Sequence, residues 1–210
     1  MPENGFEALT RLIELGGPVV VVLLLLSMVA AATIVYKLLQ LRRYSAGYFH
    51  ALADRMSGSP AEVPADDAIG ELLGFALAEQ ESRPMEPSHS LQHGTSPTQA
   101  LEAEVSRRGS HLLSGLSRYL RLLELIAYIS PLLGLLGTVL GMIDAFRGLE
   151  VEVNQADAGV LAGGIWEALL TTAMGLGIAI PVAAAHALLE GRVQRIGEQL
   201  QDVLQQALSP

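Results

Sequence analysis

The chain has 210 residues, of which half are hydrophobic, and it carries a net charge of −9 and no cysteine. The lack of cysteine excludes a disulfide framework and a thiolate metal site. The acidic balance argues against a nucleic-acid partner, because phosphate binding needs clustered Lys and Arg. Such a composition fits either an unusually apolar soluble domain or a membrane protein, and the positions of the apolar residues decide between them.

The N-terminal residues form a short apolar pattern of their own. Phe6, Leu9, Leu12 and Ile13 have helical spacing, and Gly16–Pro18 then interrupts the pattern. Two interpretations fit, a short interfacial helix or a frayed end.

A first membrane-spanning helix follows. Leu15–Tyr36 contains no charged residue and is long enough to cross a hydrocarbon core of about 30 Å. Val19–Leu26 is apolar all the way round, whereas a helix of a soluble protein has a polar face. The charged residues before the span are mostly acidic, unlike those in the leading region of a cleaved signal peptide, so we expect a permanent helix.

The segment between the first two spans reads as a short amphipathic helix between linkers. Ser57–Pro64 and Arg83–Pro97 are rich in Ser, Pro and Gly. The residues that share one helical face between them are Ile69, Leu72, Leu73, Ala76 and Leu77. His89 and His93 are four residues apart, but they stand in a Pro-broken linker that does not hold this spacing, so we expect no metal and no cofactor.

Two further spans lie in the C-terminal half. Leu125–Ile143 is uncharged, and Ala158–Leu189 carries a single charge, at Glu167. A helical rhythm from Thr98 onward predicts that the second membrane helix begins well outside the membrane. The third continues along a narrow apolar seam that we expect to pack against neighbouring chains, made of Val193, Ile196, Leu200, Val203 and Ala207.

The positive charges predict the topology. They cluster after the first span, before the second and after the third, at Lys37, Arg42, Arg43, Arg107, Arg108, Arg118, Arg121, Arg192 and Arg195. The positive-inside bias therefore places the N-terminus outside the membrane and the C-terminus in the cytoplasm. The expected organisation is a periplasmic segment 1–17, a span 18–41, a cytoplasmic loop 42–121, a span 122–146, a periplasmic loop 147–160, a span 161–189 and a cytoplasmic helix 190–210.

Enzyme motifs are absent from the sequence, which has no phosphate-binding Gly-rich loop, no His-Glu-x-x-His and no Gly-x-Ser-x-Gly, so we expect no enzyme. Small and polar residues lie inside the spans instead. In the second span, Gly134, Gly137, Thr138 and Gly141 share one side, which lets another helix approach closely. Pro131 frees a carbonyl four residues earlier, so we expect a kink or a change of pitch there.

The third span presents a second small-residue surface. It is formed by Ala168, Thr172, Gly175 and Ala179, with Glu167 and Thr171 on its flank and Pro181 beyond it. A charged carboxylate in mid-membrane costs about 2.5 to 3.5 kcal/mol, so Glu167 either faces protein or water or lies at the outer interface. The threonines either serve transport or only bond to carbonyls of their own helix.

These two segments resemble a known family along their whole length. Ile126–Phe146 (IAYISPLLGLLGTVLGMIDAF) and Gly164–Pro181 (GIWEALLTTAMGLGIAIP) are similar to the second and third helices of the MotA/TolQ/ExbB proton channel family. MotA-like stator proteins have four spans, so the resemblance is to the three-span ExbB and TolQ branch. Trp166 departs from the family pattern, which has a small or polar residue there.

The resemblance implies an all-α, pore-forming homopentamer in the bacterial inner membrane, with helices 2 and 3 extended into the cytoplasm. An ExbD- or TolR-like partner would place its single helices in the pore and supply a membrane aspartate that takes up and releases protons. The family's pore threonines fall on Thr138 and Thr172 and its membrane glutamate on Glu167. Thr171 remains a second candidate, because on an ideal helix it lies directly beneath Glu167.

The implied function is that of a proton-channel subunit that uses the proton motive force, with a TonB-like protein, to power outer-membrane import. A TolQ-like role with a TolA-like protein, in envelope integrity and division, is the alternative. From a different class, a passive membrane scaffold would also have closely packed spans.

Overall fold

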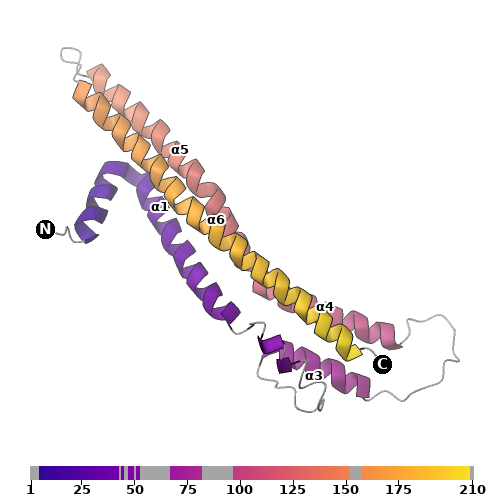
Figure 1. Ribbon diagram of the computed structural model, residues 1–210. Coiled ribbons are helices and arrows are strands. Elements are labelled where there is room, and N and C mark those ends of the chain that lie inside the picture. The colour runs from indigo at the N-terminus through magenta and orange to yellow at the C-terminus, as the bar shows by residue number, and fades with distance from the viewer. Residues whose placement is uncertain are drawn as a thin grey trace. The chain divides into compact units, whose positions relative to one another are not determined.

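A computed structural model describes residues 5–42, 44, 47–49, 51–52, 67–81, 97–151 and 158–208. Its principal elements are helices only: α1 (Gly5–Arg42), α3 (Ala68–Glu81), α4 (Pro97–Ser117), α5 (Leu120–Val151) and α6 (Ala158–Leu208) (Figure 1). Three stretches are long and apolar enough to cross a membrane, namely Gly17–Phe49, Leu101–Gly148 and Leu161–Gln206. The predicted all-α fold with three spans is thereby confirmed.

The chain divides into two compact units. The first comprises Met1–Tyr36 and Tyr119–Leu188, and the second comprises Lys37–Arg118 and Leu189–Pro210. The first therefore holds most of the apolar length of the spans. The second holds α3, α4 and the C-terminal part of α6.

Helix α1 bends where the sequence has Gly16–Pro18. Gly17 has φ 57° and ψ −158°, a backbone conformation that only glycine adopts without strain, and Pro18 then begins the next helical stretch (Figure 1). The residues before the bend are helical, so the helix, and not the frayed end, is the interpretation that holds. Val20 and Leu23, just after the bend, are fully buried.

Helices α5 and α6 run side by side in the first unit (Figure 1). Both are longer than the expected spans, since α5 continues to Val151 and α6 begins at Ala158, which shortens the loop expected at 147–160. Helix α5 also continues through Pro131 without interruption. Many large apolar side chains of both helices remain exposed, including Tyr128, Trp166 and Ile180 at 73, 66 and 67 %. Such surfaces call for lipid or for neighbouring chains.

The helix expected from Thr98 into the second span is not continuous. Residues Arg118 and Tyr119 form a turn that ends α4 at Ser117 and starts α5 at Leu120. The Tyr119 ring meets the ring of Tyr36 edge to face, with 5.8 Å between centroids. Helical periodicity alone missed this break because α4 and α5 keep the same apolar spacing across it.

The second unit has its own apolar core. Helices α3 and α4 pack together, and the predicted amphipathic face of α3 is buried through Ile69, Leu72, Leu73 and Ala76. The C-terminal seam of α6 is buried against the same chain, since Leu200 lies 3.9 Å from a Cβ position at Gly109. The expectation that this seam packs against neighbouring chains is therefore wrong, because the exposed fraction of Leu200 is only 1 %.

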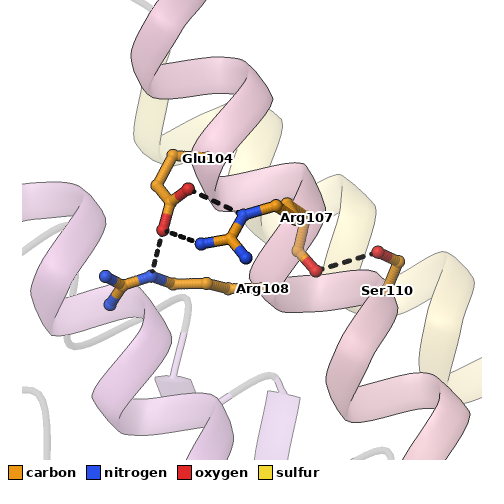
Figure 2. Close-up of polar contacts among 4 residues, drawn as sticks. All are labelled: Glu104, Arg107, Arg108 and Ser110. Atoms are coloured by element: carbon orange, nitrogen blue, oxygen red, sulfur yellow. Dashed lines mark hydrogen bonds and ion pairs between the residues drawn. The ribbon is translucent and has the colours of Figure 1, made fainter.

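Helix α4 carries charged residues, unlike the apolar spans. Glu104 accepts hydrogen bonds from Arg107 and Arg108, and Ser110 bonds the Arg107 carbonyl (Figure 2). The Arg108 guanidinium also lies 3.9 Å from the ring centroid of Phe75 on α3. A crossing needs about 20 apolar residues, and charges of this density are costly in hydrocarbon, so we assign the crossing to α5. In this exposed cluster the hydrogen bonds from Arg107 and Arg108 lower the pKa of Glu104 to about 2.

Lys37 is a fully buried ammonium group in the second unit. Its Nζ donates to the Leu116 carbonyl at 2.6 Å and to Gln40 Oε1 at 2.8 Å. Leu116 belongs to the last turn of α4, where carbonyls have no partner within their own helix. The lysine therefore ties α1 to the C-terminal end of α4.

Candidate functional site

The site lies where α5 and α6 touch through residues without bulky side chains. A Cβ atom at Gly137 would lie 2.5 Å from Thr171 Oγ1, and one at Gly175 would lie 2.6 Å from the Ser130 carbonyl oxygen. Cβ atoms do not approach other atoms so closely, so glycine is required for this helix spacing. The glycines of α5 thus bring backbone and hydroxyl groups of the two helices within bonding distance.

The same close contact continues toward the loop between the two helices. A Cβ atom at Gly141 would lie 3.1 Å from the Ala168 Cβ, and one at Gly164 would lie 2.5 Å from the Ala145 Cβ. Ala145 and Ala168 are themselves buried, with exposed fractions of 6 and 2 %.

The Gly134 carbonyl is the polar centre of the contact. Thr172 Oγ1 donates to it at 3.0 Å, and Thr171 Oγ1 lies 3.3 Å from it. In an α-helix the same oxygen accepts the amide of the residue four positions later, which is Thr138. One carbonyl therefore links both threonines that the family resemblance assigns to the pore.

Thr138 lies partly exposed on α5. Its Oγ1 donates to the Leu135 carbonyl at 2.6 Å. The hydroxyl borders a groove of about 570 Å³ whose other walls are Val139, Met142, Ile143, Phe146 and Arg147. A polar group thus stands at the edge of a mostly apolar groove.

The direction of these hydrogen bonds determines what the two hydroxyls can bind. A carbonyl oxygen only accepts, so the hydrogen in each bond comes from the threonine. A hydroxyl has one hydrogen, and Thr138 and Thr172 have both committed theirs to backbone carbonyls. Each retains lone pairs and can accept a hydrogen bond from water, hydronium or a protonated carboxylic acid, but it cannot donate to a carboxylate without breaking its present bond.

Thr171 and Thr172 take different positions from those expected. Thr171 is the buried one, with 3 % exposed, and it also donates to the Ala168 carbonyl at 2.7 Å. Thr172 lies partly exposed at the edge of the contact. The sequence placed Thr172 on the small-residue surface and Thr171 on its flank. The structure favours Thr171 for the buried place because Gly137 opposite leaves room for its side chain.

The remaining candidate residues do not join this centre. Glu167 is partly exposed on α6, and no bond to the threonines is recorded for it within the described residues. Pro181 is exposed on the same helix, outside the close contact with α5. The described parts of the chain also contain no cluster of three or more metal-ligating side chains. His89 and His93 lie outside the described residues.

Sequence reasoning missed two polar groups on α5, one backbone carbonyl and one side-chain hydroxyl. The Gly134 carbonyl accepts the bonds from α6, and Ser130, which is fully buried, donates to the Ile126 carbonyl at 2.7 Å. Four-residue spacing between Gly134 and Thr138 was visible in the sequence, but a carbonyl has no sequence signal of its own. Only the relative rotation of the two helices identifies it as an acceptor.

Comparison with known proteins gives the same assignment for this region. The model of the MotA/TolQ/ExbB proton channel family matches residues 77–202. "Biopolymer transport protein exbB1" of Vibrio cholerae is 48% identical over 85 residues, which are 40% of this chain and 37% of that protein. The "Tol-Pal system protein TolQ" of Pseudomonas aeruginosa is 36% identical over 112 residues, which are 50% of this chain and 46% of that protein.

A longer alignment reaches the first span as well. The "Putative biopolymer transport protein ExbB homolog" of Methanothermobacter thermautotrophicus is 27% identical over 192 residues, which are 90% of this chain and 66% of that protein. The chain thus spans between about a third and two thirds of the length of these relatives. The family match covers more than half of the chain, including α5 and most of α6. The chain is a multi-pass inner-membrane protein that belongs to the MotA/TolQ/ExbB proton channel family.

Proposed function

We propose that the chain is the proton-channel subunit of an inner-membrane complex that converts the proton motive force into work. The observation that carries this proposal is the pair of threonine hydroxyls of Thr138 and Thr172, each of which donates its hydrogen to a backbone carbonyl of α5 and presents only lone pairs. The subunit acts on protons and carries out no covalent chemistry on a substrate. It works with its C-terminus in the cytoplasm and its N-terminus in the periplasm.

The proton-binding group comes from another protein. Within the described spans Glu167 is the only carboxylate in the middle of an apolar helix, and it is not among the hydrogen-bond partners of the threonines there. The partner is an ExbD- or TolR-like protein with a single span and a membrane aspartate. Five copies of this chain surround the partner helices, with α5 and α6 toward the pore.

The hydroxyls then discriminate between two protonation states. A protonated aspartic acid donates a hydrogen bond to Thr138 or Thr172, whereas the charged aspartate finds only lone pairs there. The partner side chain therefore passes the threonines in its neutral form and releases its proton beyond them. Each charge that crosses releases about 2.3 kcal/mol per 100 mV of membrane potential, which drives the movement of the partner.

The work is delivered to the outer membrane. Relatives named ExbB and TolQ both match this chain, and of the two compared above exbB1 of Vibrio cholerae has the higher identity over its aligned residues, 48% against 36%. This favours a TonB-like protein and import across the outer membrane. A TolA-like protein and envelope integrity are the alternative within the same family.

Substituting Thr172 tests the proposal. Thr172→Val keeps the side-chain volume and removes the hydroxyl, so proton flux in proteoliposomes with the co-purified partner should fall about tenfold or more, as expected for one lost hydrogen bond at the limiting step. Thr172→Ser should retain most of the flux. Thr33→Val is a matched control, because the Thr33 hydroxyl bonds only the Val29 carbonyl of α1.

Assembly is measured in parallel by the mass of the purified complex. Unchanged flux in an intact Thr172→Val complex would exclude the relay role. A chain that acted only as a scaffold would tolerate this change and changes at Thr138 equally well.

A further inference from the structure

A second site lies within the second unit. Its cavity has a volume of about 430 Å³ and lies between the end of α1 and the C-terminal part of α6. The lining residues are Leu41, Arg42, Tyr44, Arg192, Arg195, Ile196 and Gln199. Three of the seven are arginines and none is acidic.

This charge is unusual for the chain. The sequence has 22 acidic residues against 13 Lys and Arg. The three arginines are exposed, and no ion pair is recorded for them in the part of the chain that the structure describes. Arg195 donates its Nε to the Gly191 carbonyl at 3.0 Å, which fixes the side chain and leaves its four remaining N–H groups available. Among the described residues, the cavity therefore presents three arginines and no acidic lining residue.

In sequence, the arginines of the cavity follow the ends of the first and third predicted spans, 18–41 and 161–189. Arg42 is the last residue of α1, and Arg192 follows Leu189, where the third apolar span ends. Leu41 and Ile196 give the cavity an apolar wall and are themselves buried, with 3 and 4 % exposed. Arginines beside an apolar wall, just past the ends of two predicted spans, match the two parts of a phospholipid, a charged phosphate and the start of its acyl chains.

We infer that this cavity binds the phosphate of an anionic phospholipid. The guanidinium groups of Arg42, Arg192 and Arg195 bind the phosphodiester oxygens, to which their planar donor pairs are suited. Tyr44 and Gln199 lie where they reach the glycerol or the headgroup. A zwitterionic lipid is bound less tightly, because its ammonium group meets the same three positive charges. The inference does not depend on proton conduction.

Lipid exchange measured on the purified complex tests the site. The probes are phosphatidylglycerol and phosphatidylcholine with the same acyl chains, added to the delipidated complex in detergent and counted by native mass spectrometry. We expect preferential retention of phosphatidylglycerol and about a fivefold weaker binding for each of Arg42→Gln, Arg192→Gln and Arg195→Gln. The double variant Arg118→Gln/Arg121→Gln is the control, because it removes exposed arginines near the second span that do not line the cavity.

Each other outcome contradicts the inference. An equal loss of phosphatidylglycerol binding in the control and cavity variants would show that the lipid is attracted to positive charge in general and not to this cavity. Full displacement of the lipid by millimolar inorganic phosphate would make the cavity a site for a free anion. Unchanged lipid binding with a loss of oligomers would assign the arginines to a neighbouring chain. If the Gln variants do not fold, the preference of the wild-type complex and the binding of the Arg192→Lys variant, which keeps the charge but not the donor pair, decide the question.

Discussion

At the scale of single residues, the close approach of α5 and α6 at Gly137 depends on the absence of a side chain there. The Thr171 side chain occupies the place of a Cβ at this position. The sequence predicted that the glycines allow close approach, but not which threonine would fill the space. Adjacent residues on a helix are about 100° apart, so Thr171 and Thr172 both border the face that contains Ala168 and Gly175, and only the facing helix selects between them.

Gly137→Ala should destabilise the protein by about 1 to 3 kcal/mol, because the added methyl group overlaps Thr171 and separates the helices. Gly177→Ala is the matched control on α6, since nothing lies within 4 Å of its Cβ position. There the substitution should be neutral or stabilising by up to about 1 kcal/mol. Thermal unfolding in the same detergent measures both, and equal stabilities would contradict the packing role of Gly137.

The Glu104 cluster predicts a small dependence of stability on pH. The folded-state pKa of Glu104 is lowered from 4.5 to about 2, so its contribution is present above pH 4.5 and is lost as the pH falls toward 2. Both arginines of the cluster are exposed to solvent, so the effect should be modest and should weaken with salt. The difference in melting temperature between the wild type and Glu104→Gln, measured from pH 6 to pH 2, should shrink over this range. A constant difference would contradict the assignment.

At the scale of elements, a hydrogen bond from α1 stabilises the end of α4, just before the break between α4 and α5. Lys37 donates to the Leu116 carbonyl just before the turn at Arg118 and Tyr119. Periodicity predicted each helix but not this break. In the sequence, Lys37 looks like one of the positive charges that commonly flank a membrane span, so nothing marks it as a buried donor. The partner of its ammonium group is a backbone carbonyl 79 positions away, which no local pattern encodes.

Replacing Lys37 by Met should destabilise the second unit by about 1 to 3 kcal/mol, because it leaves a buried carbonyl of α4 without its donor. Gln40→Leu removes only the second acceptor, so its effect should be smaller. Hydrogen exchange of the last turn of α4 separates the two variants. Equal protection in Lys37→Met and the wild type would show that the bond does not stabilise this turn.

At the scale of the whole molecule, the exposed apolar surface of the first unit must be covered by lipid or by neighbouring chains. Leu132, Leu135 and Phe146 on α5 are more than half exposed, at 52, 58 and 55 %. The three spans and the helices that extend beyond them were predicted correctly, because long apolar runs and their period are local properties. It erred on the seam of α6, since whether a seam meets its own chain or another depends on how the chain folds back.

We expect the complex extracted in mild detergent to contain five copies of this chain and at least one single-span partner. The exposed apolar side chains of α5 and α6 provide the surface for this assembly. Native mass spectrometry counts the copies directly. A monodisperse monomer that conducts protons would contradict both the assembly and the shared pore.

Lys37 is the only lysine in the chain. Amine-directed reagents consequently have a single side-chain target, and that target is concealed as long as α1 stays bound to the end of α4. The rate at which the Lys37 amine is acylated therefore measures how often this contact opens. The same measurement with and without a membrane potential would report, without any added label, whether the contact between Lys37 and the end of α4 opens more often while the complex is energised.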